Sequence, residues 1–270
     1  MIDNNKMQHE KLVDVIIPFH NEEKYLERCI LSLKKQKYIR KIIGINDFST
    51  DNSKEICLKY NVQVFDMEVP IQKRKSEMAD NLNLGLSNSN AMYLLKLDAD
   101  VEIVSEDYTA TLVEFLENEK NKKFFSASGV VYVLEPHWLK ALDLFFQRIP
   151  RGPARLYRTD ALKKIGGFTY NKKLKVEGTS GEMVHKQTDY ATDLLAFKHN
   201  YKVKFIRKVK AIHYRPSRMH LSYNLYKDSI YRNLAKLFCS LIAFNLKMVF
   251  EGLKYITKFC RYKIYKLFRL

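Results

Sequence analysis

The chain has 270 residues, of which 46% are hydrophobic and 29% are charged. This composition supports one sizeable hydrophobic core and excludes a disordered chain. Four cysteines are present but form no Cys-x-x-Cys pair, which argues against a disulfide framework and against a zinc site. The opening MIDNNKMQHE has no apolar run, so we expect no signal peptide and a reducing cytoplasm.

The net charge of +17 is distributed unevenly along the chain. Residues 1–120 carry 16 Lys and Arg against 21 Asp and Glu, whereas residues 121–270 carry 31 against 9. This asymmetry indicates that the second half faces an anionic partner, and phospholipid, nucleic acid and a phosphorylated substrate are the candidates. A soluble domain from a lysine-rich proteome is the alternative.

The first hundred residues alternate between apolar runs typical of strands and segments with the apolar spacing of helices. The segment 21–36 has Asn21 as its expected N-cap and two glutamates in its first turn. The short connections predict parallel βαβ units in an open sheet. The expected strands are 13–20, 41–47, 62–67 and 91–100, and the expected helices are 21–36, 49–60 and 76–89.

Beyond residue 120 the pattern is less regular. Residues 124–134 are expected to form a strand, and 154–168 a strand, a short helix and a glycine turn. Residues 188–201 have the spacing of a helix, and 202–216 that of strands near the edge of the domain.

Residues 221–270 have a helical pattern of a different character. Six basic residues fall within an arc of roughly 80°, and most apolar and aromatic side chains lie away from it. The stretch Leu237–Leu246 has no charge but is far shorter than the roughly 20 residues that span a bilayer. Two interpretations stay open: a helix lying in a membrane interface, and a helix packed on the catalytic domain. The basic residues of the arc are Lys236, Lys247, Lys254, Lys258, Arg261 and Arg269.

Polar residues follow the expected strands where each one ends. Asp47 ends one strand, and Asp98 and Asp100 end another, in YLLKLDADVEI (93–103). Ligands bind outside the carboxyl ends of the strands in open parallel sheets. Residues i and i+2 of a strand point the same way, so these two carboxylates repel each other unless a cation lies between them. Mg²⁺ or Mn²⁺ with a diphosphate fits that need; a solvated strand end is the alternative.

The segment INDFSTDNS (45–53) has two interpretations of its own. Asp47 can accept hydrogen bonds from a base or a ribose, and the helix start that follows favours anions. An ordinary N-capping turn explains Ser49, Thr50 and Asp51 equally well.

Several segments, in this order, resemble the family-two glycosyltransferases, which have the GT-A fold. VDVIIPFHNEEKYLERCILSL, INDFSTDNS, LNLGL and KLDAD resemble the nucleotide-binding half of that family. LYRTDALKKIGGF and TDYATDLLAFKHNYKV resemble its acceptor half, and DSIYRNLAKLF resembles the Arg-Asn helix that often follows the domain. The resemblance covers roughly residues 11–238 and implies an α/β architecture with an open, mostly parallel sheet flanked by helices.

The resemblance implies a metal-dependent, inverting transfer of a sugar from a nucleoside diphosphate sugar to an acceptor. The metal would be Mn²⁺ or Mg²⁺. The absence of a Gln-x-x-Arg-Trp motif favours a non-processive enzyme. The residues implied at the donor site are Pro18 and Phe19 for the base, Asn21, Asp47 for the nucleoside, one of Lys73, Arg74 and Lys75 for phosphate, Asp98 for ribose or metal, and Asp100 and His213 for metal.

The resemblance places the general base at Asp189, the second residue of a pair that is usually Glu-Asp. Thr188 stands where Glu is usual, and Asp193 and Glu182 are close enough in sequence to compete. A carboxylate favoured by the dipole of a helix start is the alternative for Asp189. Trp138 could stack on a sugar or pack as an ordinary aromatic residue.

The expected organisation is an N-terminal extension (1–10), a catalytic domain (11–220) and a C-terminal helical segment (221–270). Within the domain, residues 11–103 would bind the nucleotide sugar and 104–220 the acceptor. We expect a protein peripheral to the cytoplasmic face of a membrane, because the basic tail favours a lipid-linked or membrane-displayed acceptor.

Three other functions have less support in the sequence. A sugar nucleotidyltransferase normally has a glycine-rich basic loop after its first strand, where this chain has PFHNEEKYL. A nucleic-acid-binding protein is disfavoured because no groove-reading motif accompanies the basic half. A catalytically degenerate, glycosyltransferase-like binding protein stays open because of Thr188.

Overall fold

The computed structural model describes residues 12–74, 76–133, 152–170 and 188–214. The expectations for the N-terminal extension, Trp138, Glu182 and the basic tail fall outside these residues, as does the boundary predicted near 220. Among the described residues, no helix is both long enough and apolar enough to cross a membrane.

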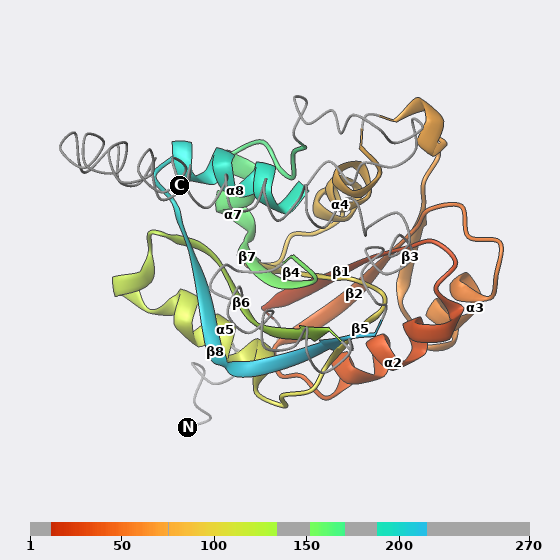
Figure 1. Cartoon of the computed structure of the whole chain (residues 1–270), viewed down its shortest axis with the longest axis horizontal. Helices are drawn as coiled ribbons and strands as arrows, with labels where there is room; N and C mark the ends of the chain where they lie inside the picture. The colour runs from red at the N-terminus through yellow and green to blue at the C-terminus, as the bar shows by residue number, and fades with distance from the viewer. Residues whose placement is uncertain (1–11, 75, 134–151, 171–187, 215–270) are drawn as a thin grey trace, which may run out of the picture. The chain divides into compact units, whose positions relative to one another are not determined.

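The described residues contain a mixed sheet of eight strands in the order β3-β2-β1-β4-β7-β6-β8-β5 (Figure 1). The first four strands run parallel, which confirms the predicted βαβ units. β7 is antiparallel to both β4 and β6, β8 is parallel to β6, and β5 is antiparallel to β8. The strands are β1 (Val13–Phe19), β2 (Ile39–Asn46), β3 (Gln63–Asp66), β4 (Tyr93–Leu97), β5 (Val101–Ile103), β6 (Phe124–Val133), β7 (Ala154–Arg158) and β8 (Lys202–His213).

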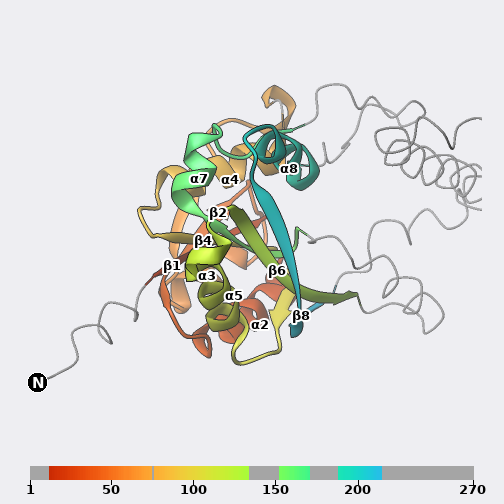
Figure 2. The same cartoon turned by 90° about the vertical axis from the view of Figure 1, so that its left-hand side faces the viewer.

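Helices cover both faces of the sheet (Figures 1 and 2). One buried apolar cluster joins the sheet to α2, α3 and α5, and a second joins it to α4, α7 and α8. The helices are α2 (Glu23–Lys34), α3 (Ser53–Lys59), α4 (Glu77–Ser87), α5 (Tyr108–Glu117), α7 (Thr159–Lys164) and α8 (Thr188–Lys198), with short 3₁₀ turns η1 (Ile71–Lys73) and η2 (Glu119–Asn121).

β1 lies inside the sheet, and all seven of its residues are buried. This explains its almost continuous apolar sequence, because a parallel strand covered on both faces has no solvent side. Its one charged residue, Asp14, accepts hydrogen bonds from Arg40 Nε at 2.8 Å and from Ser89 Oγ at 2.6 Å. β2 and β4 flank β1, so the chain reverses its direction of winding there, and the carboxyl ends of these strands form the expected place for a ligand.

The structure corrects several details of the sequence-based expectations. The strand expected over 91–100 ends at Leu97, so Asp98 and Asp100 follow the strand and do not lie on it. α2 begins at Glu23 with Glu22 at the cap position, so Asn21 is not its N-cap. Residues 202–216 were expected to form strands, and the described part forms one long strand, β8. β5 and α5 were not predicted. β5 has only three residues and takes its place from pairing with β8.

Candidate active site

The first polar cluster lies where β2 ends and is centred on the carboxylate of Asp47. Arg74 Nη2 donates to its Oδ1 at 2.5 Å, and Asn81 Nδ2 donates to its Oδ2 at 2.9 Å. Arg74 Nη1 also donates to Asn81 Oδ1 at 2.6 Å, which closes a ring of three side chains. The side chains of Asp47 and Arg74 are only 5% and 3% exposed. Arg74 is one of the residues predicted to contact phosphate. In the structure it lies against Asp47, the residue predicted to contact the nucleoside.

One donor of this cluster has no acceptor. Arg74 Nε is buried and has no hydrogen-bond partner among the described residues. Leaving such a group unpaired costs about 1–3 kcal/mol. A ligand that brings an acceptor oxygen or nitrogen to Arg74 would remove this cost.

The end of β1 lies beside Asp47, whose amide donates to the carbonyl of Phe19 at 2.9 Å. Pro18 and Phe19 are both buried. A Cβ on Gly44 would lie 3.0 Å from Phe19 Cε1, so the Phe19 ring covers β2. His20 Nδ1, by contrast, lies 2.5 Å from the carbonyl oxygen of Asp47. A role for Pro18 and Phe19 in a base pocket stays a prediction.

The loops after β1 and β2 are joined by hydrogen bonds. Asn21 Oδ1 accepts from the Thr50 amide at 2.7 Å, and Ser49 Oγ accepts from the Asn21 amide at 3.1 Å. Glu23 Oε2 accepts from the Asn52 amide at 3.2 Å. These bonds tie the segment before α3 to the end of β1 and the start of α2, whereas the cap residue Asn52 makes no side-chain cap hydrogen bond. Both interpretations of this segment therefore stay open.

The second cluster contains Asp98, Asp100 and His213, whose ligand atoms all lie within 4.8 Å of one another. Asp98 follows β4, and its amide donates to the carbonyl of Pro153 at 2.8 Å. Pairing of β5 with β8 sets Val101 opposite His213, and His213 Nε2 lies 3.0 Å from Asp100 Oδ1. Strand pairing therefore brings together residues more than a hundred positions apart in the sequence.

The donor set of this cluster fits a divalent cation. Carboxylate oxygens suit Mg²⁺ and Mn²⁺, and an imidazole nitrogen is a common additional ligand. Burial raises the pKa of Asp98, the ammonium of Lys96 opposes this effect, and the neighbouring carboxylate of Asp100 adds to it. A cation bound here would relieve that repulsion. Asp98, Asp100 and His213 are the residues predicted for the metal.

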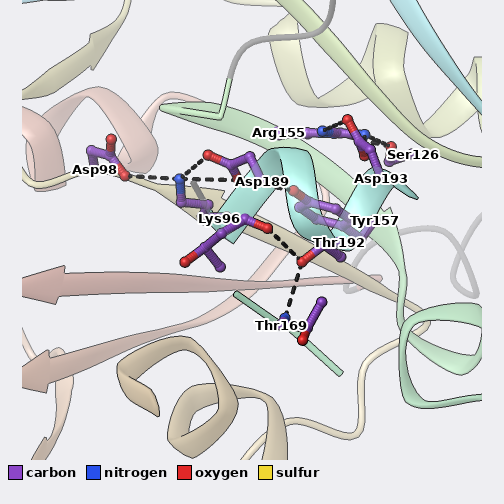
Figure 3. A network of polar contacts seen from close by, with 10 residues as sticks. Lys96, Asp98, Ser126, Arg155, Tyr157, Thr169, Asp189, Thr192 and Asp193 are labelled. Carbon is purple, nitrogen blue, oxygen red and sulfur yellow. Dashed lines mark hydrogen bonds and ion pairs between the residues drawn. The ribbon is translucent and has the colours of Figure 1, made fainter. Parts of the chain in front are cut away.

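A buried lysine, which the sequence analysis did not single out, connects this cluster with the acceptor side (Figure 3). Lys96 is 2% exposed, and its Nζ lies 3.4 Å from Asp98 Oδ1 and 3.1 Å from Asp189 Oδ2. Burial alone lowers the pKa of Lys96, but the carboxylates of Asp189 and Asp98 outweigh it and the pKa is raised. The sequence held one signal for Lys96: a lysine within an otherwise apolar strand indicates a buried charge with a partner, because lysine is almost never fully buried without one.

Asp189 lies in the first turn of α8, and its side chain is 31% exposed. Besides Lys96, it accepts a long hydrogen bond of 3.4 Å from the Tyr157 hydroxyl. A Cβ on Gly152 would lie only 1.6 Å from Asp189 Oδ2, so this backbone passes directly behind the carboxylate. Lys96 therefore contacts both the predicted base, Asp189, and one of the predicted metal ligands, Asp98.

Asp193, one turn further along α8, has a different environment. Arg155 is fully buried and donates to both Asp193 oxygens, at 2.6 and 3.0 Å, and also to Ser126 Oγ. Burial raises the pKa of Asp193, and the guanidinium of Arg155 opposes this effect. A carboxylate held in this way fixes α8 to β7 and β6 and is poorly placed to compete with Asp189 as a base (Figure 3).

Comparison with known proteins identifies the family of the chain. Residues 14–167 match the family model described as Glycosyl transferase family 2. The chain is similar to Glycosyltransferase GlyG of Streptococcus pneumoniae serotype 4, with 34% identity over 110 residues, which are 40% of this chain and 36% of GlyG. It is also similar to Glycosyltransferase GlyA of the same strain, with 33% identity over 37% of this chain and 14% of GlyA. The match thus spans about a third or less of these relatives.

Solved structures show the same fold. The mannosyltransferase PcManGT from Pyrobaculum calidifontis, in complex with GDP-Man and Mn²⁺, has a TM-score of 0.56 at 17% identity, over 86% of this chain and 64% of that one. The glucosyl-3-phosphoglycerate synthase from Mycobacterium tuberculosis, with Mn²⁺, UDP and phosphoglyceric acid, has a TM-score of 0.55 at 15% identity, over 78% and 74%. At these identities the likeness establishes the fold.

Proposed function

Because this chain belongs to glycosyl transferase family 2, we propose that it transfers a sugar from a nucleoside diphosphate sugar to an acceptor hydroxyl, with inversion and with the help of Mn²⁺ or Mg²⁺. The predicted family and its GT-A fold are confirmed by the family match and by the solved structures. The observation that carries the proposal is that Asp98, Asp100 and His213 meet at the strand ends. Lys96 connects this cluster to Asp189, because it contacts both Asp98 and Asp189.

Asp98, Asp100 and His213 would hold the cation. Bound there, a divalent cation supplies positive charge that stabilises the departing nucleoside diphosphate. Two complexes among the structural neighbours contain Mn²⁺ with GDP-Man or with UDP, which supports a cofactor of this kind.

Asp189 would act as the general base. Inversion requires the acceptor hydroxyl to attack from the face opposite the leaving group, and the proton of that hydroxyl must pass to a nearby acceptor. The carboxylate of Asp189 is partly exposed and so can meet an acceptor, whereas Asp193 is committed to Arg155.

The Asp47–Arg74 pair suits one class of nucleobase. A carboxylate accepts a hydrogen bond from a ring N–H, and a guanidinium donates to an adjacent carbonyl. Uracil, thymine and guanine present both groups side by side, whereas cytosine has an unprotonated ring nitrogen next to its carbonyl. The unpaired Arg74 Nε adds a donor for such a carbonyl. Arg74 would then serve the base rather than the phosphate.

A thermal-shift series tests these proposals together. Wild type and Asp100→Asn are melted with UDP, GDP, dTDP and CDP, each with and without Mn²⁺. A ligand that binds only the folded state raises the melting temperature by mass action. We expect metal-dependent stabilisation of the wild type by one or more of the first three nucleotides and none by CDP. Loss of the metal dependence in the variant would support the cation site.

Two outcomes would contradict the proposal. Stabilisation by none of the four nucleotides would favour a degenerate domain that no longer binds donors. Stabilisation that is equal with and without Mn²⁺ would remove the metal from the mechanism and leave Asp98 and Asp100 to the ribose.

The acceptor and the membrane belong to the same proposal. Within the described residues, β8 carries five exposed basic residues, which supports an anionic partner for the second half of the chain. A lipid-linked or membrane-displayed acceptor fits this charge. The test is deletion of residues 239–270, which should reduce both binding to anionic liposomes and activity with lipid acceptors. Unchanged liposome binding and unchanged activity would contradict the proposed lipid-linked or membrane-displayed acceptor. The five residues are Lys202, Lys204, Arg207, Lys208 and Lys210.

A further inference from the structure

We propose that Lys96 and Gly152 are positioning residues that form a fitted seat for the carboxylate of Asp189. The inference rests on the proposed function of Asp189 as the base. It adds two residues that the sequence analysis did not single out, one from a strand of the donor half and one from the backbone that precedes β7. Each constrains Asp189 by a different physical means.

Lys96 constrains Asp189 by charge. It lies on β4, one residue before the end of the strand, and Asp98 follows directly after that end. Its Nζ lies 3.1 and 3.4 Å from the two oxygens of Asp189 and 3.4 Å from Asp98 Oδ1. One buried ammonium thus separates two carboxylates that would otherwise face each other, and Asp189 takes the closer contact.

Gly152 constrains Asp189 by shape. A Cβ at this position would lie 1.6 Å from Oδ2 and 2.3 Å from Cγ of Asp189. Gly152 is not among the described glycines with positive φ, which are Gly166 and Gly167. The glycine is therefore required for space, not for an unusual backbone conformation. Any other residue at 152 must push the carboxylate out of its place beside Lys96.

The rest of α8 is already fixed, so the seat acts on the side chain alone. Arg155 holds Asp193 one turn away, and the Thr192 hydroxyl accepts from the amide of Thr169, outside the helix, at 3.1 Å. Tyr157 approaches the same carboxylate from β7 at 3.4 Å (Figure 3). A displacement of a catalytic group by about 1 Å can cost 100-fold in rate. We therefore expect the seat to govern turnover.

The test uses Gly152→Ala and Lys96→Met in the full-length protein, with steady-state kinetics and nucleotide binding in the presence of Mn²⁺. Gly152→Ala keeps every charge of the site and should lower kcat about 10- to 100-fold with less than about a threefold change in donor KM. Lys96→Met should lower kcat by a similar factor and more than it changes donor KM. Lys96→Arg, which keeps the charge, should recover part of the loss.

Two matched controls separate positioning from general damage. Gly166→Ala also adds a methyl group at a glycine, but nothing lies within 4 Å of that position and its φ is +92°. Arg40→Met also breaks an ion pair to a buried carboxylate, that of Asp14 at the start of β1. Both should lower the melting temperature and leave kcat near wild type.

The outcomes distinguish this inference from the proposed function. If Asp189→Asn keeps near-wild-type activity, the proposed base is wrong and the seat has no catalytic group to position. If Asp189→Asn is inactive while Gly152→Ala keeps wild-type kcat, the seat is overturned and the base stands. The double variant Lys96→Met with Asp189→Asn should be no slower than Asp189→Asn alone; an additive loss would show that Lys96 acts elsewhere. Where Lys96→Met does not fold, Gly152→Ala and Lys96→Arg decide the question.

Discussion

Asp47 and Asp189 are two carboxylates at the same edge of the sheet, and they are held in opposite ways. Asp47 is 5% exposed, and each of its oxygens accepts a bond of 2.9 Å or less, from Arg74 or Asn81. Asp189 is 31% exposed, and its hydrogen bonds to Lys96 and Tyr157, the partners found among the described residues, are 3.1 Å or longer.

The difference in burial and bond length suits the two roles proposed for these carboxylates. A group that recognises a ligand gains from short bonds and burial, because both fix one arrangement in advance. A group that takes a proton needs an open side for the acceptor and enough support to stay oriented. The closed ring around Asp47 suits its proposed role in donor recognition, and the open side of Asp189 suits its proposed role as the base.

Removing the carboxylate of Asp189 should give the largest effect. Asp189→Asn keeps the shape but has no basic oxygen for the proton, so kcat should fall by about 10²–10⁴. Binding of the nucleoside diphosphate should stay close to wild type, because the donor ring does not include this residue. Single-turnover release of nucleoside diphosphate measures the first quantity and calorimetry the second. A matching loss of nucleotide affinity would contradict the separation of the two sides.

Breaking the anchor of α8 should cost stability rather than recognition. Arg155→Met leaves the buried carboxylate of Asp193 unpaired, and the free energy of unfolding should fall by about 3–5 kcal/mol. Urea unfolding measures this change. Lys54→Met is the control, since it breaks the exposed ion pair with Asp66 and should cost at most about 1 kcal/mol. Equal losses in both variants would show that the buried pair has no special part.

Breaking the donor ring should weaken nucleotide binding without a comparable effect on α8. Asp47→Asn leaves Arg74 buried without a charged partner and replaces an acceptor oxygen by a donor. We expect the Kd for the preferred nucleoside diphosphate to rise about 10- to 100-fold, from the loss of a charge-assisted hydrogen bond of about 1.5–3 kcal/mol. Isothermal titration in the presence of Mn²⁺ measures this. An unchanged Kd would remove Asp47 from the base site.

The smallest expected effect concerns Phe48, in the loop that follows Asp47. Phe48 has a φ of +56° and is 46% exposed, so it bears backbone strain and buries little of its ring. Phe48→Gly should raise the free energy of unfolding by about 0.5–1 kcal/mol, since glycine accepts this φ without steric cost. Thermal melting without ligand checks it. If nucleotide binding weakens instead, the exposed ring contacts the ligand.

Local patterns predicted the donor half well. The strands β1 to β4 and the helices between them follow from apolar periodicity and short connections, which are properties of neighbouring residues. Their ends were less certain: α3 begins at Ser53, four residues later than expected, because residues 49–52 bond to the loop after β1. Asn21 was misjudged for the same reason, since its side chain serves that loop and not its own helix.

Other features of the structure depended on contacts that the sequence does not display. β5 is too short to be recognised alone and exists because β8 pairs with it. The choice of Asp189 over Asp193 is equally non-local, because Arg155 on β7 occupies Asp193. Lys96 had a local signal, a charge within a buried strand, but its two partners could not be named from that signal.

The sequence by itself determined the βαβ half, the family resemblance and the pair of aspartates after β4, because these rest on short-range spacing and on motifs that stand together in the chain. The tertiary structure decided what those residues face: Arg74 against Asp47, His213 beside Asp100, and Asp189 between Lys96 and Gly152. Burial makes such pairings selective, because a charge removed from water is tolerated only where the fold supplies a partner.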